Sequence, residues 1–190
     1  MVGRSWTDDT SQPPTIGRVT ENSKRTAGWP AHRFTGVDVW PFRGGGEAAE
    51  FLLLHRSGRD GSPFWQGVSG WIEDGELPHL AALRELREES GFDAIELYSV
   101  DAVFDLYAWR RGTVEGIVPF AALVNGEPVP ILSDEHDDWR WAPLAAAVEL
   151  VPYELQRAAL RRIGADLLSR PELAHLYRIG ESTESAEKSR

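Results

Sequence analysis

The segment from Pro78 to Ser90 constrains the fold of this chain more than any other part of the sequence. Proline is tolerated in the first turn of a helix and glycine commonly follows the last turn, so this proline and the following Gly91 predict a helix between them. At about 100° per residue, Leu80, Leu83 and Leu86 form one apolar stripe. We therefore expect a helix that packs on its leucine side and leaves the opposite side polar.

Three carboxylates, Glu85, Glu88 and Glu89, gather on the face turned away from that stripe. Like charges at these spacings destabilise an exposed helix by roughly 0.2–0.5 kcal/mol per pair, so the clustering calls for a reason. Ala81 and Ala82 lie one turn earlier, and their small side chains leave space for a bulky group to approach. The two arginines of the segment relieve part of the repulsion, so an ordinary solvated surface helix is the alternative.

The loop before the helix favours a metal site over a solvated surface. Residues 70–76 read Gly-Trp-Ile-Glu-Asp-Gly-Glu, which combines two glycines with three further acidic groups. Glycine permits unusual backbone geometry and close approach of other groups. Carboxylate oxygens are the ligands that Mg²⁺ prefers, usually one or two of them together with waters and substrate phosphates. The loop and the helix therefore predict a magnesium-binding constellation.

Gly70, Glu76 and residues 84–92, which read Arg-Glu-Leu-Arg-Glu-Glu-Ser-Gly-Phe, are similar to the complete sequence signature of the Nudix hydrolases. Every fixed position of that signature is filled. Phe92 stands where the family more often has an aliphatic residue, a difference that concerns packing at the helix end. The resemblance implies an α/β fold, a Nudix-type α/β/α sandwich with a mixed sheet between helices.

The same resemblance implies a role for each matching residue. Glu85, Glu88 and Glu89 would ligate Mg²⁺, with Mn²⁺ as the alternative ion, and Gly70 would offer its backbone carbonyl. Arg84 and Glu76 would form an orienting ion pair. Such a cation would neutralise phosphate charge and lower the pKa of a bound water, whose proton a carboxylate could take. Glu73 and Asp74, by contrast, are interpreted as solvated loop residues.

Two further segments resemble parts of bacterial dihydroneopterin triphosphate diphosphatases, related nucleoside triphosphate enzymes and dinucleoside polyphosphate hydrolases. They are residues 64–70 and 135–141. By that comparison Glu135 is the candidate for an additional metal ligand or general base, although an acidic run in a loop is often only solvated. Arg56 and Trp65 are candidates for substrate binding, through phosphate contacts and ring stacking. His136 is interpreted as structural or as a group behind the ligands, because Mg²⁺ does not favour imidazole.

The order of predicted elements is compatible with that sandwich. We expect strands at 35–42, 50–55, 95–106, 114–124 and 139–141, with helices at 144–151 and 152–168. Residues 1–30 are predicted to be a mobile polar tail and residues 179–190 a polar C-terminal tail, with the Nudix domain at 31–178.

Charge and composition limit the partners. The net charge of −10, from 20 basic against 30 acidic residues, disfavours a nucleic acid polymer but not a small phosphate ester whose charge bound cations offset. The chain has no cysteine, which excludes disulfides and thiolate chemistry. We expect no membrane span, no secretory signal and a cytoplasmic location. The sequence leaves open whether the protein forms a homodimer.

The resulting functional prediction is Mg²⁺-dependent hydrolysis of a diphosphate linkage in a nucleoside or pterin triphosphate, releasing pyrophosphate. Dinucleoside polyphosphate hydrolysis is the close alternative. A binding module that senses a nucleotide without cleaving it is less favoured, because the chain keeps all the signature carboxylates. Isopentenyl diphosphate isomerisation is disfavoured by the lack of cysteine, and RNA decapping by the lack of a basic stretch.

Overall fold

The structure is a computed structural model that describes residues 32–58, 62–109, 111–125 and 129–180. The predicted tail at 1–30 and most of the predicted tail at 179–190 lie outside the described residues. Within the described part of the chain, no helix is long and apolar enough to cross a membrane.

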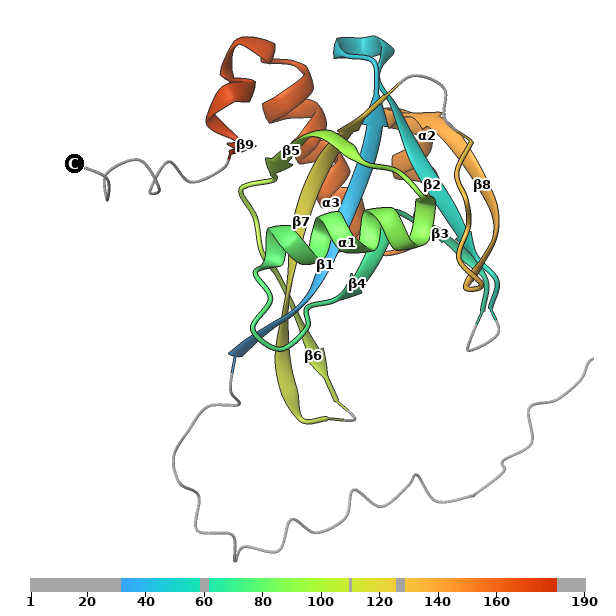
Figure 1. Cartoon of the computed structure of the whole chain (residues 1–190), viewed down its shortest axis with the longest axis vertical. Helices are drawn as coiled ribbons and strands as arrows, with labels where there is room; N and C mark the ends of the chain where they lie inside the picture. The colour runs from blue at the N-terminus through green and yellow to red at the C-terminus, as the bar shows by residue number, and fades with distance from the viewer. Residues whose placement is uncertain (1–31, 59–61, 110, 126–128, 181–190) are drawn as a thin grey trace, which may run out of the picture.

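The described residues form a nine-stranded mixed sheet flanked by helices (Figure 1). The strands are β1 (His32–Arg43), β2 (Glu50–Arg56), β3 (Phe64–Gln66), β4 (Val68–Trp71), β5 (Ala94–Ser99), β6 (Phe104–Ala108), β7 (Thr113–Val124), β8 (His136–Pro143) and β9 (Arg178–Ile179). The helical elements are α1 (Pro78–Ser90), α2 (Leu144–Leu150) and α3 (Glu154–Arg162), the short 3₁₀ turns η1 (Gly46–Ala48) and η3 (Pro171–Leu176), and the π-helical turn η2 (Ile163–Leu168). Strands β1 and β7 are parallel, whereas the other pairs are antiparallel.

Two apolar cores lie on opposite faces of the sheet, because successive side chains of a strand point to opposite sides. Val37 and Val39 of β1 pack with the α1 residues Ala82 and Leu86. Trp40 of β1 instead packs in the core that contains α2 and α3. The α/β class and the mixed sheet between helices are therefore as predicted, with α1 on one face and α2 and α3 on the other (Figure 1).

The central strand β1 changes partner along its length. Phe42 and Arg43 pair with β2, whereas the stretch from Gly36 to Val39 pairs with β4. Beyond Phe51, β2 leaves β1 and its edge pairs with β3 instead, while its other edge pairs with β8 along the whole strand. Gly67 joins β3 to β4 where a Cβ would lie 2.6 Å from the carbonyl oxygen of Val39, so only glycine fits this crossing without a shift. After this crossing the chain continues through β4 into the loop before α1.

Helix α1 has the bounds that its proline and glycine predicted. Gly91 has a φ of 74° and its N–H donates to the carbonyl of Arg87, which is the left-handed C-terminal cap that glycine favours. The predicted leucine stripe is wrong, however. Leu80 and Leu83 are 48% and 37% exposed, and the buried residues of the helix are Ala81, Ala82, Leu86, Glu89 and Ser90.

The physical reason for this difference is how closely α1 lies on the sheet. The helix approaches β4 and β1 through its alanines, whose small side chains allow close packing. The space that Ala81 and Ala82 leave is therefore filled by the sheet and not by a ligand.

Other predicted elements differ in their bounds. The strand predicted at 95–106 is two strands, β5 and β6, which separate near Asp101, a non-glycine residue with a φ of 43°. The helix predicted at 152–168 is α3 followed by the π-helical turn η2. Strands β3 and β4 were not predicted, because each has only three or four residues and Gly67 lies between them.

Asp38 is a buried carboxyl group on the α3 side of β1, where Gln156 of α3 hydrogen-bonds to it. Burial raises the pKa of Asp38 from 3.8 to about 7, and the hydrogen bond from Gln156 opposes this only in part. The folded protein therefore holds a proton at pH values where the unfolded chain releases it.

We expect stability to fall as the pH rises from about 4 to about 7 because of this residue, and to lose nothing further from it above that range. The pKa shift corresponds to roughly 4 kcal/mol at most. Asp38→Asn removes the titrating group while keeping an oxygen that accepts from Gln156, so its melting temperature should exceed that of the wild type at pH 8 by much more than at pH 5. Thermal denaturation at both values measures this, with Asp74→Asn in an exposed turn as the control. An equal difference at the two pH values would contradict the prediction.

Candidate functional site

The candidate site begins where β4 lies against α1 at Gly70. Gly70 pairs with Val37 of β1, so the sheet fixes its backbone. A Cβ on this residue would overlap the carboxyl group of Glu85. The absence of a side chain therefore lets the carboxylate of Glu85 lie directly against the strand.

Arg84 connects the helix to the loop before it. Its Nε and Nη2 donate to the two carboxylate oxygens of Glu76 at 3.0 and 2.9 Å, and Nη2 also donates to the Trp71 carbonyl at 2.8 Å. A paired guanidinium and carboxylate with two parallel hydrogen bonds is a strong and directional contact. The bond from Arg84, followed by one from the backbone N–H of Glu73, lowers the pKa of Glu76. The loop is thereby held in one position relative to α1.

The same guanidinium contacts two of the predicted metal ligands. Nη1 of Arg84 donates to Glu85 at 2.7 Å and to Glu88 at 3.2 Å. The side chain of Glu85 is 12% exposed and that of Glu88 is 58% exposed. Burial raises the pKa of Glu85, although Arg84 opposes the rise. The three carboxylates of α1 thus lie in different environments, with Glu88 nearest to solvent.

Glu89 is the most buried of the three, at 6% exposed. Its carboxylate accepts a hydrogen bond of 3.1 Å from the backbone N–H of Ser69 in β4. Burial raises the pKa of Glu89 to about 8; the negative charges of Glu85 and Glu135 add to the rise, while the Ser69 N–H and Arg56 oppose it. The charges of Arg56 in β2 and of Glu135 before β8 therefore act on the buried carboxyl group of Glu89.

Arg56 and Glu135 supply those charges as an ion pair. Arg56 ends β2, Glu135 precedes β8, and Nη1 of Arg56 lies 2.9 Å from the Glu135 carboxylate. The pair is on the same side of the sheet as α1, since Arg56 follows Leu54 of the α1 core by two residues. Both predicted residues are therefore near the α1 carboxylates.

Trp65 lies elsewhere. Its side chain packs against the core on the α3 face, with the guanidinium of Arg140 4.1 Å from its ring centroid and the imidazole of His55 4.8 Å away. The structure does not bring Trp65 together with the α1 carboxylates, because alternate strand residues face opposite sides and its neighbour Gln66 faces the α1 side instead.

Gln66 and the backbone N–H of Ser69 are site features that the sequence reasoning did not single out. Gln66 is 3% exposed and its Nε2 lies 3.3 Å from Nε2 of His136. Burial is the main cause of a lowered pKa at His136, which keeps this imidazole neutral near pH 7. In the sequence, the only indication of a role for Gln66 is that it lies within the segment 64–70, which resembles related enzymes.

The donor set fits a hard divalent cation by its chemistry and charge. The ligand candidates are oxygens, the Cα of Gly70 faces the carboxylate of Glu85, and the carboxyl of Glu89 is buried beside two other carboxylates. A cation would relieve the electrostatic cost that the raised pKa of Glu89 expresses. Among the described residues, no three acidic or imidazole groups already converge on one point, and Arg84 engages two of the candidates instead. Binding would require Glu85 and Glu88 to turn from the guanidinium toward the ion.

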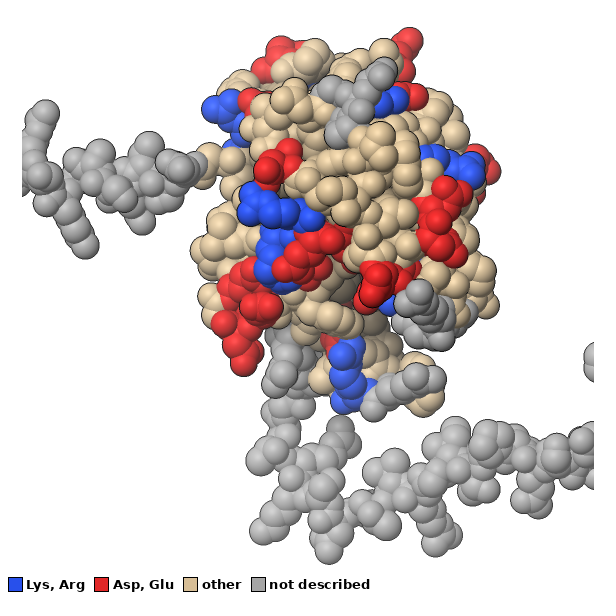
Figure 2. All heavy atoms as spheres, turned by 45° about the vertical axis from the view of Figure 1, so that its right-hand side comes forward, with Lys and Arg blue, Asp and Glu red and all other residues tan. Residues whose placement is uncertain are grey.

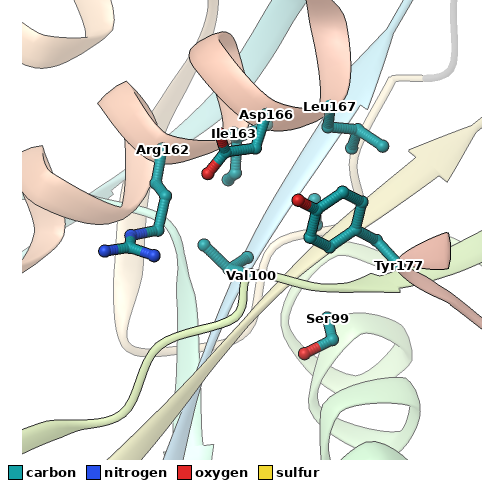
Figure 3. A pocket seen from close by; sticks show the side chains of 8 residues that line it. Ser99, Val100, Arg162, Ile163, Asp166, Leu167 and Tyr177 are labelled. Carbon is teal, nitrogen blue, oxygen red and sulfur yellow. The ribbon is translucent and has the colours of Figure 1, made fainter. Parts of the chain in front are cut away.

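Figure 2 shows the surface on the α1 side, where acidic side chains gather in two areas separated by a hollow, with basic groups among them. A separate small pocket lies on the opposite face, between β5 and η2 (Figure 3). Arg162, Asp166 and Tyr177 surround its floor at Val100. This pocket belongs to the α3 side and is not part of the carboxylate cluster.

Comparisons with known proteins agree with this arrangement. The NUDIX domain family model matches residues 32–165. A mouse bis(5'-nucleosyl)-tetraphosphatase [asymmetrical] is 34% identical over 124 residues, covering 64% of this chain and 83% of that protein. An Escherichia coli dihydroneopterin triphosphate diphosphatase is 32% identical over 110 residues, covering 51% of this chain and 72% of that protein.

A longer relative and a solved structure complete the comparison. An octanoyltransferase from Myxococcus xanthus is 31% identical over 151 residues, which cover 76% of this chain but only 40% of that protein. The crystal structure of a C. elegans Ap4A hydrolase binary complex superposes with a TM-score of 0.57 and 27% identity, covering 68% of this chain and 94% of that one.

The tight contact at Gly70 leads to a prediction. Gly70→Ala should force the Glu85 carboxylate away from β4 and weaken Mn²⁺ binding about 10- to 100-fold, the usual cost of displacing a metal ligand's support. Calorimetric titration with Mn²⁺ measures this without any substrate. Gly45→Ala is the matched control, since Gly45 has an extended φ of −162° and a Cβ there would meet no other group within 4 Å. Wild-type Mn²⁺ affinity in a folded Gly70→Ala protein would contradict the prediction.

Proposed function

Because the chain belongs to the NUDIX domain family, we propose that it hydrolyses a diphosphate linkage of a nucleoside polyphosphate with the help of Mg²⁺. The observation that carries this proposal is the carboxylate cluster of α1 held against Gly70, with Glu135 and Arg56 facing it. Its relatives include hydrolases of nucleotide-like substrates.

Glu85, Glu88, Glu89 and Glu135 would hold the divalent ion together with the Gly70 carbonyl. When bound, such an ion neutralises phosphate charge and makes a coordinated water more acidic. The protein's part is to hold these oxygens in place. Arg84 does so by joining Glu76 and the Trp71 carbonyl to the helix, which fixes the loop between α1 and β4, the strand on which Gly70 lies.

Glu135 is the proposed general base. It is 56% exposed, so water and substrate can reach its carboxylate, and it comes from a different element than the α1 ligands. A base must lie within hydrogen-bond reach of the proton that it takes, directly or through one water. Arg56 directs this carboxylate through their ion pair, and a guanidinium group is also suited to contact phosphate oxygens.

The first substrate class we propose is a nucleoside or pterin triphosphate that releases pyrophosphate. Similarity to the E. coli dihydroneopterin triphosphate diphosphatase supports this class. The second is a dinucleoside tetraphosphate, supported by the 34% identity to the mouse tetraphosphatase, of which 83% is covered. Octanoyl transfer is not proposed, because the match covers less than half of the Myxococcus xanthus protein.

One experiment separates these classes. The purified chain is incubated with Mg²⁺ and either a nucleoside triphosphate, dihydroneopterin triphosphate or diadenosine tetraphosphate, and the products are identified by chromatography. A triphosphate should give a monophosphate and pyrophosphate, whereas the tetraphosphate should give ATP and AMP. Excess EDTA should abolish either reaction. Binding without turnover on every substrate would favour the non-catalytic nucleotide-binding module instead.

Among the α1 carboxylates, we expect Glu88→Gln to reduce kcat the most while the protein stays folded. Glu88 lies between Glu85 and Glu89 along the helix, so it is best placed to contact more than one cation. Glutamine keeps the size and helix propensity but removes the charge, and losing about 4 kcal/mol of transition-state stabilisation is on the order of a thousandfold in rate. Steady-state kinetics at saturating Mg²⁺ measure the loss, and melting temperatures confirm folding. Glu73→Gln, in the exposed loop, is the control and should cost little. Near wild-type turnover in Glu88→Gln would refute this role.

A further inference from the structure

A β-bulge lies where β2 and β8 meet beside the candidate site. His55 pairs with Asp138 and Arg56 pairs with His136, so Asp137 has no residue opposite it in β2. Bulges bend a strand and turn its side chains in new directions, and they recur next to active sites. Glu135 and Arg56, the proposed base and its partner, lie directly at this irregularity.

The two residues of the bulge are held on opposite faces of the sheet. Asp137 points toward the α3 face, where its carboxylate lies 2.6 Å from Nδ1 of His55. His136 points toward the α1 face and is 6% exposed. Its Nδ1 lies 3.1 Å from Oγ of Ser133, and its Nε2 lies 3.3 Å from Nε2 of Gln66. The imidazole is therefore held from both sides.

These contacts suit a neutral imidazole that carries its proton on Nδ1. The Gln66 amide nitrogen donates to Nε2 of His136, and the Nδ1–H of His136 donates to Oγ of Ser133. Gln66 comes from β3, which pairs with β2 on the side away from β8, so the contact spans the three strands. Ser133 comes from the segment before β8. The imidazole of His136 thus connects the start of β8, beside the site, to the buried side chain of Gln66 in β3.

The main chain carries this restraint to Glu135. The N–H of His136 donates to the Ser133 carbonyl at 3.2 Å, and the N–H of Ser57 donates to the Glu135 carbonyl at 2.9 Å. Glu135 is therefore fixed through its backbone on both sides, while its carboxylate meets Arg56. Without the anchored ring, the exposed carboxylate would lose its direction relative to α1.

We propose that Gln66 and Ser133 are positioning residues that act through His136 to hold Glu135 and Arg56 opposite the α1 carboxylates. The role rests on the proposed function, since it assumes that Glu135 acts in hydrolysis. It predicts that the contacts on the two sides of His136 matter for the rate and not only for stability.

The test uses Gln66→Met, which keeps the volume but removes the amide, and Ser133→Ala. Each should lower kcat about 10- to 100-fold with little change in KM, the range observed for groups that support a metal ligand or its equivalent. In the Glu135→Gln background the same changes should cost almost nothing further, because the residue through which they act is already lost. Ser133→Thr, which keeps the hydroxyl, should restore the rate. Ser169→Ala is the control, since Oγ of Ser169 donates to the Gly164 carbonyl on the other face.

A second measurement does not depend on turnover. Amide hydrogen exchange at Ser57 and His136, followed by NMR, should be faster in Gln66→Met and Ser133→Ala than in the wild type and in Ser169→Ala. Unchanged exchange at both amides would overturn the positioning role, as would a full additional loss of kcat in the Glu135→Gln background. A wild-type protein that cleaves no nucleotide would instead overturn the proposed function, while the exchange rates would still report whether the anchor exists. If Gln66→Met does not fold, the comparison of Ser133→Ala with Ser133→Thr decides.

Discussion

The close packing of α1 on β4 is the contact on which the rest of the site depends. Gly70 has no side chain, and Ala81 and Ala82 have small ones, so the helix lies near enough for its carboxylates to reach the strand backbone. Ser69 can then donate its N–H to Glu89, and Glu85 can lie against Gly70. A bulkier residue at any of these positions would move the whole row of acids, because interiors are packed too densely to absorb the difference locally.

This packing has an electrostatic cost that the surrounding arginines only partly offset. Arg84 donates hydrogen bonds to the carboxylates of Glu76, Glu85 and Glu88. Arg56 forms an ion pair with Glu135, and its positive charge also opposes the rise in the pKa of Glu89. Burying carboxylates near one another disfavours their charged forms. Proteins often keep such unfavourable arrangements at functional sites and compensate elsewhere, here with two apolar cores on the faces of one sheet.

The sequence predicted the parts of the molecule that depend on local chemistry. Pro78 and Gly91 set the ends of α1, and the spacing of the glutamates placed them on neighbouring turns. The sequence did not reveal how closely the elements lie to one another in the folded protein. The leucines seemed the obvious packing side, but the alanines lie closer to the sheet, so Leu80 and Leu83 are at the surface. Similarly, Trp65 and Gln66 are adjacent in the chain, yet only the register of β3 against β2 decides which of them faces α1. Asp101 interrupts a run of strand-forming residues through its backbone angle, which composition does not reveal.

The parallel pairing of β1 with β7 also bears on how the protein reaches its fold. Trp40 pairs with Ala121 and Val37 with Val118, so the centre of the sheet joins segments that are far apart in the sequence. Bringing such segments together costs chain entropy before any contact repays it, and topologies rich in distant pairings fold slowly. During synthesis, the apolar residues of β1 leave the ribosome long before β7 exists. The nascent chain therefore passes through a stage in which the apolar residues of β1 lack the strand that will pair with them.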